Sequence, residues 1–253
     1  MLLLQDTLPA AAHDSYQHKK KGLIVKKGDI KKQVILDTAE MLFCRNGYEQ
    51  TSIQDILDRL NSSKGSFYHH FPSKEALLEG ICRRRAEKIY YASCSCIGDD
   101  ESIIMKMNHI LSGMIPFMDE KIGFLMMLLP IFRLPEGRMV RLSYCEALSE
   151  QFYPYLCRLL QDGLQNGELF SAEPDITAGL ILSIVNSLWV KICMTVISCE
   201  ENHTETDISE LLRLADCYRL MIERMVFLPY GSLKLIDIPS LKYLIGQIHN
   251  HWI

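Results

Sequence analysis

The feature that most constrains the fold is a pair of short helical runs bounded by residues that interrupt a helix. Thr51 precedes a stretch whose Ile and Leu residues recur on one helical face, so we expect it to be an N-cap. Asn61 tolerates the left-handed backbone of a tight turn, and Ser62 or Ser63 can cap the helix that follows. Pro72 should end that second helix, because the residue before a proline is driven out of the helical region.

The flanking segments complete the pattern. Residues 30–46 place apolar side chains on one helical stripe, and Gly47 follows as a stop signal. Ser73 restarts a helix that should run to about Cys94, with the basic residues 83–85 facing outward for part of a turn. Three short helices joined by tight turns and followed by a long one are typical of a helix-turn-helix unit with its connecting helix.

Helical spacing dominates the rest of the sequence, and strand signals are scarce. We therefore predict an all-α fold, with an N-terminal three-helix helix-turn-helix domain and a larger C-terminal helical domain for ligand binding and dimerisation. The expected division is a basic arm at 1–28, the helix-turn-helix domain at 29–89 (motif at about 52–71), the larger domain at 90–230 and an extension at 231–253. Breaks that include Pro130 separate helices expected at 100–115, 119–129, 138–166, 175–199 and 206–228 and an apolar segment at 230–253.

Charge is divided unevenly along the chain. The formal net charge is −4, yet residues 1–92 carry fifteen Lys and Arg against eleven Asp and Glu, a balance of +4. Residues 93–253 carry twelve against twenty, a balance of −8. This asymmetry favours contact of the first part with a polyanion. The densest run, residues 18–32, holds seven lysines and one acid, Asp29, and a solvated tail explains it equally well.

The sequence contains no recognisable catalytic arrangement. His69 and His70 are adjacent, so on a helix they point about 100° apart and cannot bind one ion together. Neither a Gly-x-Ser-x-Gly elbow nor a phosphate-binding loop is present. Nine cysteines, an odd number without a recognisable secretory signal, favour free thiols in a reducing compartment. We expect no enzymatic activity and no cofactor, and a thiol- or metal-responsive regulator that uses Cys94 and Cys96 is an alternative.

The second short helix carries side chains suited to DNA. A short helix held against its predecessor can insert its N-terminal part into a major groove, and its free N–H groups favour phosphate. Serines and a lysine near its start add donors and charge, and Gly65 lets the backbone approach closely. Tyr68 and His69 can reach sugar-phosphate or base edges, whereas Phe67 and Phe71 are expected to pack inward.

Residues 35–78 resemble the DNA-binding domain of tetracycline-repressor-type (TetR) transcriptional regulators. The resemblance implies a recognition helix from Ser63 to Phe71, and phosphate contacts from Thr51 or Ser52 and from Lys74. The matching residues are Ile35, Leu36, Ala39, Leu42, Phe43, Gly47, Thr51, Ile53, Ile56, Ser63, Lys64, Gly65, Ser66, Tyr68, Phe71, Lys74 and Leu77.

Three residues depart from the pattern of the family. Asn61 stands where Gly is usual, Ser62 replaces an apolar residue, and Leu57 replaces Ala. Residues 159–190 weakly resemble the stretch that leads into the dimerisation helices of the family. The predicted partner is a double-stranded DNA operator, and the predicted contacts are Thr51, Ser52, Ser62, Ser63, Lys64, Gly65, Ser66, Tyr68, His69 and Lys74.

One recognition helix reads too few base pairs, so a two-fold dimer that reads two half-sites is expected. The helices near 175–199 and 206–228 each carry more apolar residues than one core stripe requires, as an interface helix does. The predicted interface residues are Leu180, Ile184, Leu188, Leu211, Ala215 and Tyr218.

The middle of the chain is rich in methionine and phenylalanine, which suit an adaptable apolar pocket but equally an ordinary core. We predict an unidentified small-molecule effector, and candidate ligand-binding residues at Met114, Phe117, Met118, Phe124, Met127 and Phe132.

Residues 175–198 approach the length of a membrane span. Asn186 and Lys191 lie in the middle of that stretch, and a helix that is apolar nearly all round is more often buried in a soluble core or an interface. A membrane-associated signalling protein with a span there is an alternative. The preferred interpretation is a cytoplasmic dimeric regulator without a membrane partner, most simply a repressor that a small molecule releases from DNA.

Overall fold

The computed structural model describes residues 27–117, 120–134 and 137–252. Within these residues there are ten helices and no strands, which confirms the all-α prediction. Residues 1–26 of the predicted basic arm lie outside the described part. In chain order the helices are α2 (Lys27–Asn46), α3 (Ile53–Leu60), α4 (Lys64–His70), α5 (Lys74–Ser95), α6 (Ile103–Gly113), α7 (Glu120–Phe132), α8 (Gly137–Gln165), α9 (Pro174–Glu201), α10 (Ile208–Met225) and α11 (Ile238–Trp252).

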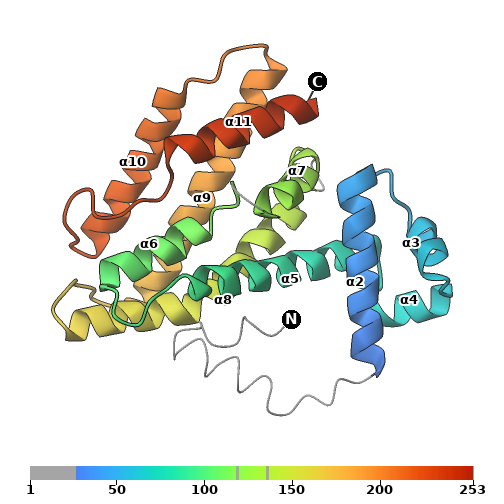
Figure 1. Cartoon of the computed structure of the whole chain (residues 1–253), viewed down its shortest axis with the longest axis horizontal. Coiled ribbons are helices and arrows are strands. Elements are labelled where there is room, and N and C mark those ends of the chain that lie inside the picture. Colours follow the sequence, from blue (N-terminus) through green and yellow to red (C-terminus); the bar gives the residue numbers. More distant parts are fainter. Residues whose placement is uncertain (1–26, 118–119, 135–136, 253) are drawn as a thin grey trace.

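The long helix α5 connects two groups of helices (Figure 1). At one of its ends α2, α3 and α4 form the helix-turn-helix domain, and along the rest it packs against α6 and α8. α9 packs on α8, and α10 and α11 pack on α9. Because α5 runs without a break through residues 89 and 90, a change in its position moves both domains.

Local chain interruptions form the turns that were predicted, with one correction. Gly47 follows α2 with a φ of 86°, and Asn61 adopts the left-handed conformation with a φ of 47°. Ser63 caps α4 and Ser73 caps α5, each by accepting a hydrogen bond from a backbone N–H of the next turn. The N-cap of α3 is Ser52 and not Thr51, which the sequence analysis had chosen.

Two helix boundaries also differ from the prediction. α2 begins at Lys27, so the end of the basic run belongs to this helix. Pro130 does not end α7, which continues to Phe132. A proline in the last turn removes only one backbone hydrogen bond, and the two residues after it are buried, which holds the end of the helix in place.

A buried cluster of ion pairs joins α2 to α5. Glu40 of α2 accepts hydrogen bonds from Arg84 Nη2 and Arg85 Nε of α5, and Arg84 Nη1 lies 2.6 Å from Asp37 Oδ1. The expectation that residues 83–85 face outward for part of a turn holds for the exposed Arg83, but Arg84 and Arg85 face inward, with side chains only 10% and 23% exposed. Burying a carboxylate is costly unless it is paired, and two guanidinium groups pair this one.

The larger helical domain has an aromatic core that contains a hydrogen-bonded polar side chain, Asn186. Trp189 of α9 is fully buried and lies 5.9 Å from the Tyr144 ring of α8. Its indole N–H donates to Asn186 Oδ1, and Asn186 Nδ2 donates to the Cys145 carbonyl and to Ser149 Oγ of α8. The polar residue that interrupts the apolar run of α9 is therefore satisfied inside the protein.

Among the described residues, α9 is the one helix that is both long and apolar enough to cross a membrane. More than half of its most apolar window, 56%, is buried inside the protein. Its length and apolar composition are thus explained by packing against α8, α10 and α11.

The C-terminal segment is attached to the domain by hydrogen bonds from its backbone. Glu223 accepts hydrogen bonds from Gly231 N (3.1 Å), Leu233 N (2.9 Å) and Arg219 Nη1 (2.6 Å). The side chain of Asn108 in α6 forms hydrogen bonds to the same segment: it donates to the Ser232 carbonyl and accepts from Lys234 N. α11 then packs on α7, α9 and α10, so residues 238–252 are part of the helical domain.

Gly113 should be required where α6 approaches α5. A Cβ added there would lie 2.2 Å from Ser93 Oγ and 2.7 Å from Ser93 Cβ. We expect Gly113→Ala to lower the free energy of unfolding by about 1–3 kcal/mol, as overpacking does, in urea denaturation. The matched control is Gly246→Ala in α11, where an added Cβ meets nothing within 4 Å. Adding Ser93→Gly to the Gly113→Ala protein should restore part of the lost free energy of unfolding. If it does not, the close approach of the two helices is not the cause of the loss.

Candidate nucleic-acid interface

One face of α4 is anchored in the protein and the other faces solvent. Phe67 and Phe71 are 0% and 4% exposed, as predicted, and Phe71 lies against α5, where a Cβ added at Gly80 would stand 3.1 Å from its ring. Opposite them, Tyr68 is 49% exposed. The exposed residues of this helix also include Lys64, Gly65 and His69.

The start of α4 leaves room for a large partner. Ser63 caps the helix by accepting from Ser66 N at 3.4 Å, so its hydroxyl is near the free N–H groups of the first turn. A Cβ added to Gly65 would meet nothing within 4 Å, which means that this part of the backbone is open on its outer side. Free N–H groups, a lysine and an open backbone together favour a phosphate oxygen.

Of the two predicted contacts at the start of α3, only Ser52 is exposed. Ser52 Oγ accepts from Asp55 N, and Asp55 Oδ2 accepts from Ser52 N at 2.7 Å, a reciprocal capping box. These hydrogen bonds from Ser52 hold the pKa of the Asp55 carboxyl below its usual value. Thr51 is 0% exposed, and its hydroxyl donates to the Gly47 carbonyl at 2.8 Å. The prediction that the Thr51 side chain contacts DNA is therefore wrong, because this side chain is buried and its hydroxyl stabilises the turn after α2.

Ser62 is a second correction. Its Oγ is buried and has no hydrogen-bond partner within the described residues, so this hydroxyl cannot reach a phosphate. The position lies in the turn between α3 and α4, where an apolar residue is usual in the family that the sequence resembles. A buried hydroxyl without a partner is costly.

Lys74 is partly enclosed at the start of α5. Its Nζ lies 4.1 Å from the centre of the Tyr48 ring and 5.9 Å from that of Phe43. Partial burial lowers the pKa of the Lys74 ammonium. The contact with the two rings fixes this ammonium beside the helix-turn-helix unit, where a phosphate would still attract it.

The structure adds Lys31 and Lys32 to the candidate surface. Both are exposed on the first turns of α2, and the Nζ of Lys32 lies 5.6 Å from the centre of the Phe71 ring at the end of α4. Partial burial, and then the charges of His69, Lys31 and Lys32, hold the pKa of His70 below its usual value. The lysine-rich run gave the sequence signal for these residues, but only the fold brings them beside α4.

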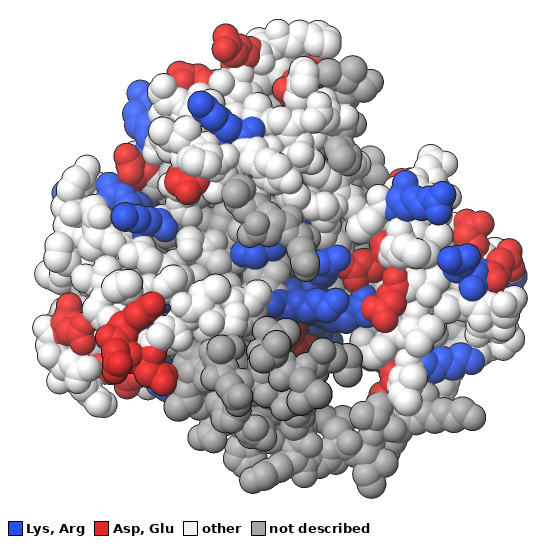
Figure 2. All heavy atoms as spheres, in the orientation of Figure 1, with Lys and Arg blue, Asp and Glu red and all other residues white. Residues whose placement is uncertain are grey.

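Charged side chains are unevenly distributed on the face drawn in Figure 2. Lys and Arg lie at several places on the helix-turn-helix domain, with Asp and Glu among them, and a group of Lys and Arg lies at the centre of this face, over α5. Acidic side chains gather at the end of the helical domain remote from α4 (Figure 2).

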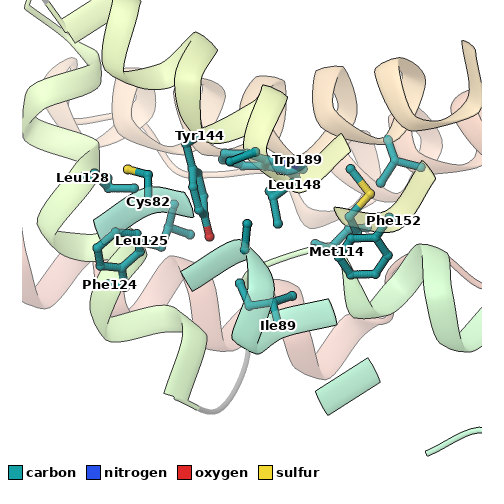
Figure 3. Close-up of a cluster of buried hydrophobic side chains, with 14 of the residues drawn as sticks. Cys82, Ile89, Met114, Phe124, Leu125, Leu128, Tyr144, Leu148, Phe152 and Trp189 are labelled. Atoms are coloured by element: carbon teal, nitrogen blue, oxygen red, sulfur yellow. The ribbon is translucent and has the colours of Figure 1, made fainter. Parts of the chain in front are cut away.

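The predicted ligand-binding residues do not converge on one cavity. Phe124 lines a cavity between α5, α7 and α8, Phe117 lines another beside the C-terminal segment, and Met127 lines a third between α2 and α7. Met114 is buried beside Phe152 in the core (Figure 3). Phe132 packs on the Trp189 ring, and Met118 lies outside the described residues. As a single site the prediction was wrong, because helical spacing cannot show which cavity a buried side chain borders.

The two closely spaced cysteines have different environments. Cys94 is buried, and burial raises the pKa of its thiol to about 11, whereas Cys96 is exposed. A raised pKa makes a thiol a weaker nucleophile and metal ligand. No group of three or more His, Cys, Asp or Glu close enough to hold a metal ion occurs in the described part of the chain.

The fold and the exposed α4 define a helix-turn-helix protein. The family profile described as "Bacterial regulatory proteins, tetR family" matches residues 35–81. The helix-turn-helix domain is thus of the type found in the tetR family.

Relatives of known name agree with this family. The HTH-type transcriptional regulator YuxN of Bacillus subtilis is 52% identical over 60 residues, which are 24% of this chain and 21% of YuxN. YerO of the same species is 30% identical over 171 residues, 62% of this chain and 55% of YerO. The chain therefore spans about a fifth of one of these relatives and about half of the other.

A solved structure shares the fold over most of the chain. A TetR-family transcriptional regulator from Pectobacterium atrosepticum superposes with a TM-score of 0.52 and 17% identity, covering 80% of this chain and 97% of the other. The arrangement of a helix-turn-helix domain on a larger helical domain is thus common to both proteins.

Ser62→Ala should stabilise the protein. The substitution removes a buried hydroxyl that has no partner and keeps the Cβ, so we expect the free energy of unfolding to rise by about 1 kcal/mol, measured by thermal or urea denaturation. Ser95→Ala is the matched control, because the hydroxyl of Ser95 is exposed and donates to the Ala92 carbonyl. A loss of stability in Ser62→Ala would mean that the hydroxyl has a partner.

Proposed function

We propose that the protein is a dimeric, sequence-specific DNA-binding transcriptional regulator in the cytoplasm, and that it acts as a repressor released by a small molecule. The observation that carries this proposal is the two-sided character of α4. Phe67 and Phe71 fix the helix to the domain, while Lys64, Tyr68 and His69 project from it. A short, rigidly held helix with an open N-terminus suits insertion into a major groove.

The proposed contacts divide into two kinds. Ser52, Ser63, Lys64 and Lys74 contact phosphates and position the protein, since they surround the starts of α3, α4 and α5. Gly65, Ser66, Tyr68 and His69 lie along α4, and this group is proposed to read base edges. Lys31 and Lys32 extend the phosphate-contacting surface along the backbone of the duplex.

Lys64→Ala and Tyr68→Ala should weaken DNA binding in different ways. Lys64→Ala should weaken binding to all sequences and reduce the slope of log K against log salt by about 1, as expected for one lost phosphate contact. Tyr68→Ala should remove the preference for selected DNA over random DNA. Fluorescence anisotropy over a salt series, with a fragment selected from a random-sequence pool, measures both.

Lys242→Ala and Tyr243→Ala are the matched controls, because both side chains are exposed on α11, away from α4. They should leave affinity and salt slope unchanged. Loss of cooperative unfolding in Tyr68→Ala would assign this side chain to the core. An unchanged salt slope with altered base preference in Lys64→Ala would assign Lys64 to base readout.

We propose that α9 and α10 form the dimer interface, through a different set of residues from that chosen on sequence. Ile176, Leu180 and Met221 are 60%, 51% and 55% exposed, which is unusual for large apolar side chains on two adjacent helices. Ser187 Oγ and Tyr218 Oη lie 3.2 Å apart and join these helices. Ile184 and Tyr218 are half-buried and border the same face. Leu188, Leu211 and Ala215 are buried in their own subunit and leave the predicted interface.

Leu180→Glu combined with Met221→Glu should give folded monomers that bind DNA weakly, because a charge in an apolar interface is desolvated without a partner. Light scattering with circular dichroism measures mass and helicity together. Met105→Glu on α6, also half-exposed, should remain dimeric. Leu188→Glu should instead unfold the subunit. A stable monomer of the unmodified protein would contradict both the interface and the reading of two half-sites.

A further inference from the structure

A cavity of about 310 Å³ lies between α5, α7 and α8. Its lining combines three cations, Arg85, Lys88 and Lys121, with the aromatic rings of Phe124 and Tyr144. Neither Asp nor Glu is among the described residues that line it. A volume of this size accommodates a small organic molecule, and a lining that combines cations with no described carboxylate favours an anion.

Tyr144 is the most deeply buried polar side chain in the lining of this cavity. The side chain is 1% exposed, and its hydroxyl forms no hydrogen bond with another described residue. Figure 3 shows the hydroxyl pointing from α8 toward α5, in a region otherwise lined by apolar side chains that include Leu125, Leu148 and Ile89. Tyr144 lines the cavity, so its hydroxyl is available to donate to an acceptor atom on a bound molecule, as buried hydroxyl groups usually do.

The cations come from two of the helices that line the cavity, Arg85 and Lys88 from α5 and Lys121 from α7. The guanidinium of Arg85 lies 5.3 Å from the centre of the Phe124 ring, and the Phe124 and Tyr144 rings are 5.6 Å apart and edge to face. Lys121 Nζ donates to the Gly113 carbonyl at 2.8 Å, and Lys88 is exposed. The apolar walls between these groups are Ile89, Ala92 and the face of Phe124.

We propose that this cavity binds a small organic carboxylate with an aromatic or aliphatic body. The carboxylate lies among Arg85, Lys121 and the Tyr144 hydroxyl. The hydroxyl donates a hydrogen bond to the carboxylate, and this ligand supplies the acceptor that the described residues do not. The body of the ligand packs on Phe124 and Ile89. A carboxylate fits better than a neutral polar group, because the planar guanidinium pairs with it in two parallel hydrogen bonds.

Arg85 couples this site to the DNA-binding domain. The same guanidinium that lines the cavity donates from Nε to Glu40 of α2, and Glu40 is 6% exposed. A ligand carboxylate competes with Glu40 for Arg85, and a buried carboxylate that loses one of its two partners is destabilised. α2 packs on α3, α5 and α7, so its displacement changes the orientation of α4. This coupling rests on the proposed function, whereas the binding site does not.

The site is tested first on the full-length protein without DNA. The probes are benzoate, 2-naphthoate, 4-phenylbutyrate and octanoate at millimolar concentration, each paired with its neutral amide. We expect at least one carboxylate to raise the melting temperature and to bind in calorimetry, while its amide does not. Equal binding of acid and amide would overturn the charge selection. Failure of all four acids to bind would overturn the site.

Variants then locate the binding site. Tyr144→Phe should lower the affinity for the carboxylate about tenfold, as loss of a hydrogen bond to a charged group does. Lys88→Met should lower the affinity by a smaller factor, because it removes a positive charge from the lining without removing a hydrogen bond to the ligand. Tyr243→Phe and Lys242→Met, exposed on α11, are the matched controls. Tyr144→Phe removes a hydroxyl without a described partner, so it should fold normally. Unchanged affinity in both cavity variants would overturn the assignment to this cavity.

The competition with Glu40 is tested by Glu40→Gln. A neutral amide competes more weakly for Arg85, so the affinity for the carboxylate should increase several-fold and the carboxylate should no longer release DNA. Unchanged affinity in a folded Glu40→Gln protein would overturn the competition. If this variant does not fold, the unmodified protein supplies the test. Coupling between two binding sites is reciprocal, so bound DNA must lower the affinity for the carboxylate by the same factor by which the carboxylate lowers the affinity for DNA. Equal carboxylate affinity with and without DNA would overturn the coupling.

These measurements separate the two proposals. Carboxylate binding that depends on Tyr144 and Lys88, in a protein with no affinity for DNA, would reject the proposed function and keep the site. DNA binding without any carboxylate binding would reject the site and keep the function.

Discussion

The arrangement of the two domains depends on one buried carboxylate. Glu40 of α2 is held by Arg84 and Arg85 of α5, and all three are largely withdrawn from water. Removing one partner from such a group costs far more than an exposed ion pair contributes. The position of α2 relative to α5 is therefore fixed by charge as well as by the apolar core. α3 packs on α2, and Phe71 at the end of α4 lies between Lys32 of α2 and Gly80 of α5. The orientation of the proposed recognition helix therefore depends on the same contact.

That contact connects the surface proposed to bind DNA with the interior of the second domain. Arg85 lies between Glu40 and the ring of Phe124, so it belongs at once to the pairing of α2 and to the lining of a cavity. A site that shares a charged side chain with a domain contact can transmit the presence of an anion without a large rearrangement, since the two carboxylates compete directly. The ligand then needs no contact with the helix-turn-helix domain.

Several features of the proposed interface were predictable from local rules. The left-handed Asn61, the caps at Ser63 and Ser73, and the inward packing of Phe67 and Phe71 follow from backbone preferences and helical spacing. The roles of Thr51, Ser62 and Lys74 were not predictable in this way. All three carry polar groups beside a turn, and only the packing of neighbouring residues decides which of them faces water. Thr51 braces the turn, Ser62 is enclosed, and Lys74 rests on two aromatic rings.

The sequence by itself determined the helical class, the helix-turn-helix unit and the positions of nearly every helix, because these depend on capping, turns and periodicity within short segments. Tertiary structure decided what depends on residues distant in the chain. Periodicity shows that α9 and α10 each have two apolar faces, but not that Leu188 faces the core and Leu180 the solvent. The run 83–85 reads as a charged surface until Glu40, more than forty residues earlier, is placed against it. Likewise, Tyr144 becomes a candidate ligand donor only when α5, α7 and α8 enclose it, since no local pattern records which hydroxyl will lack a partner.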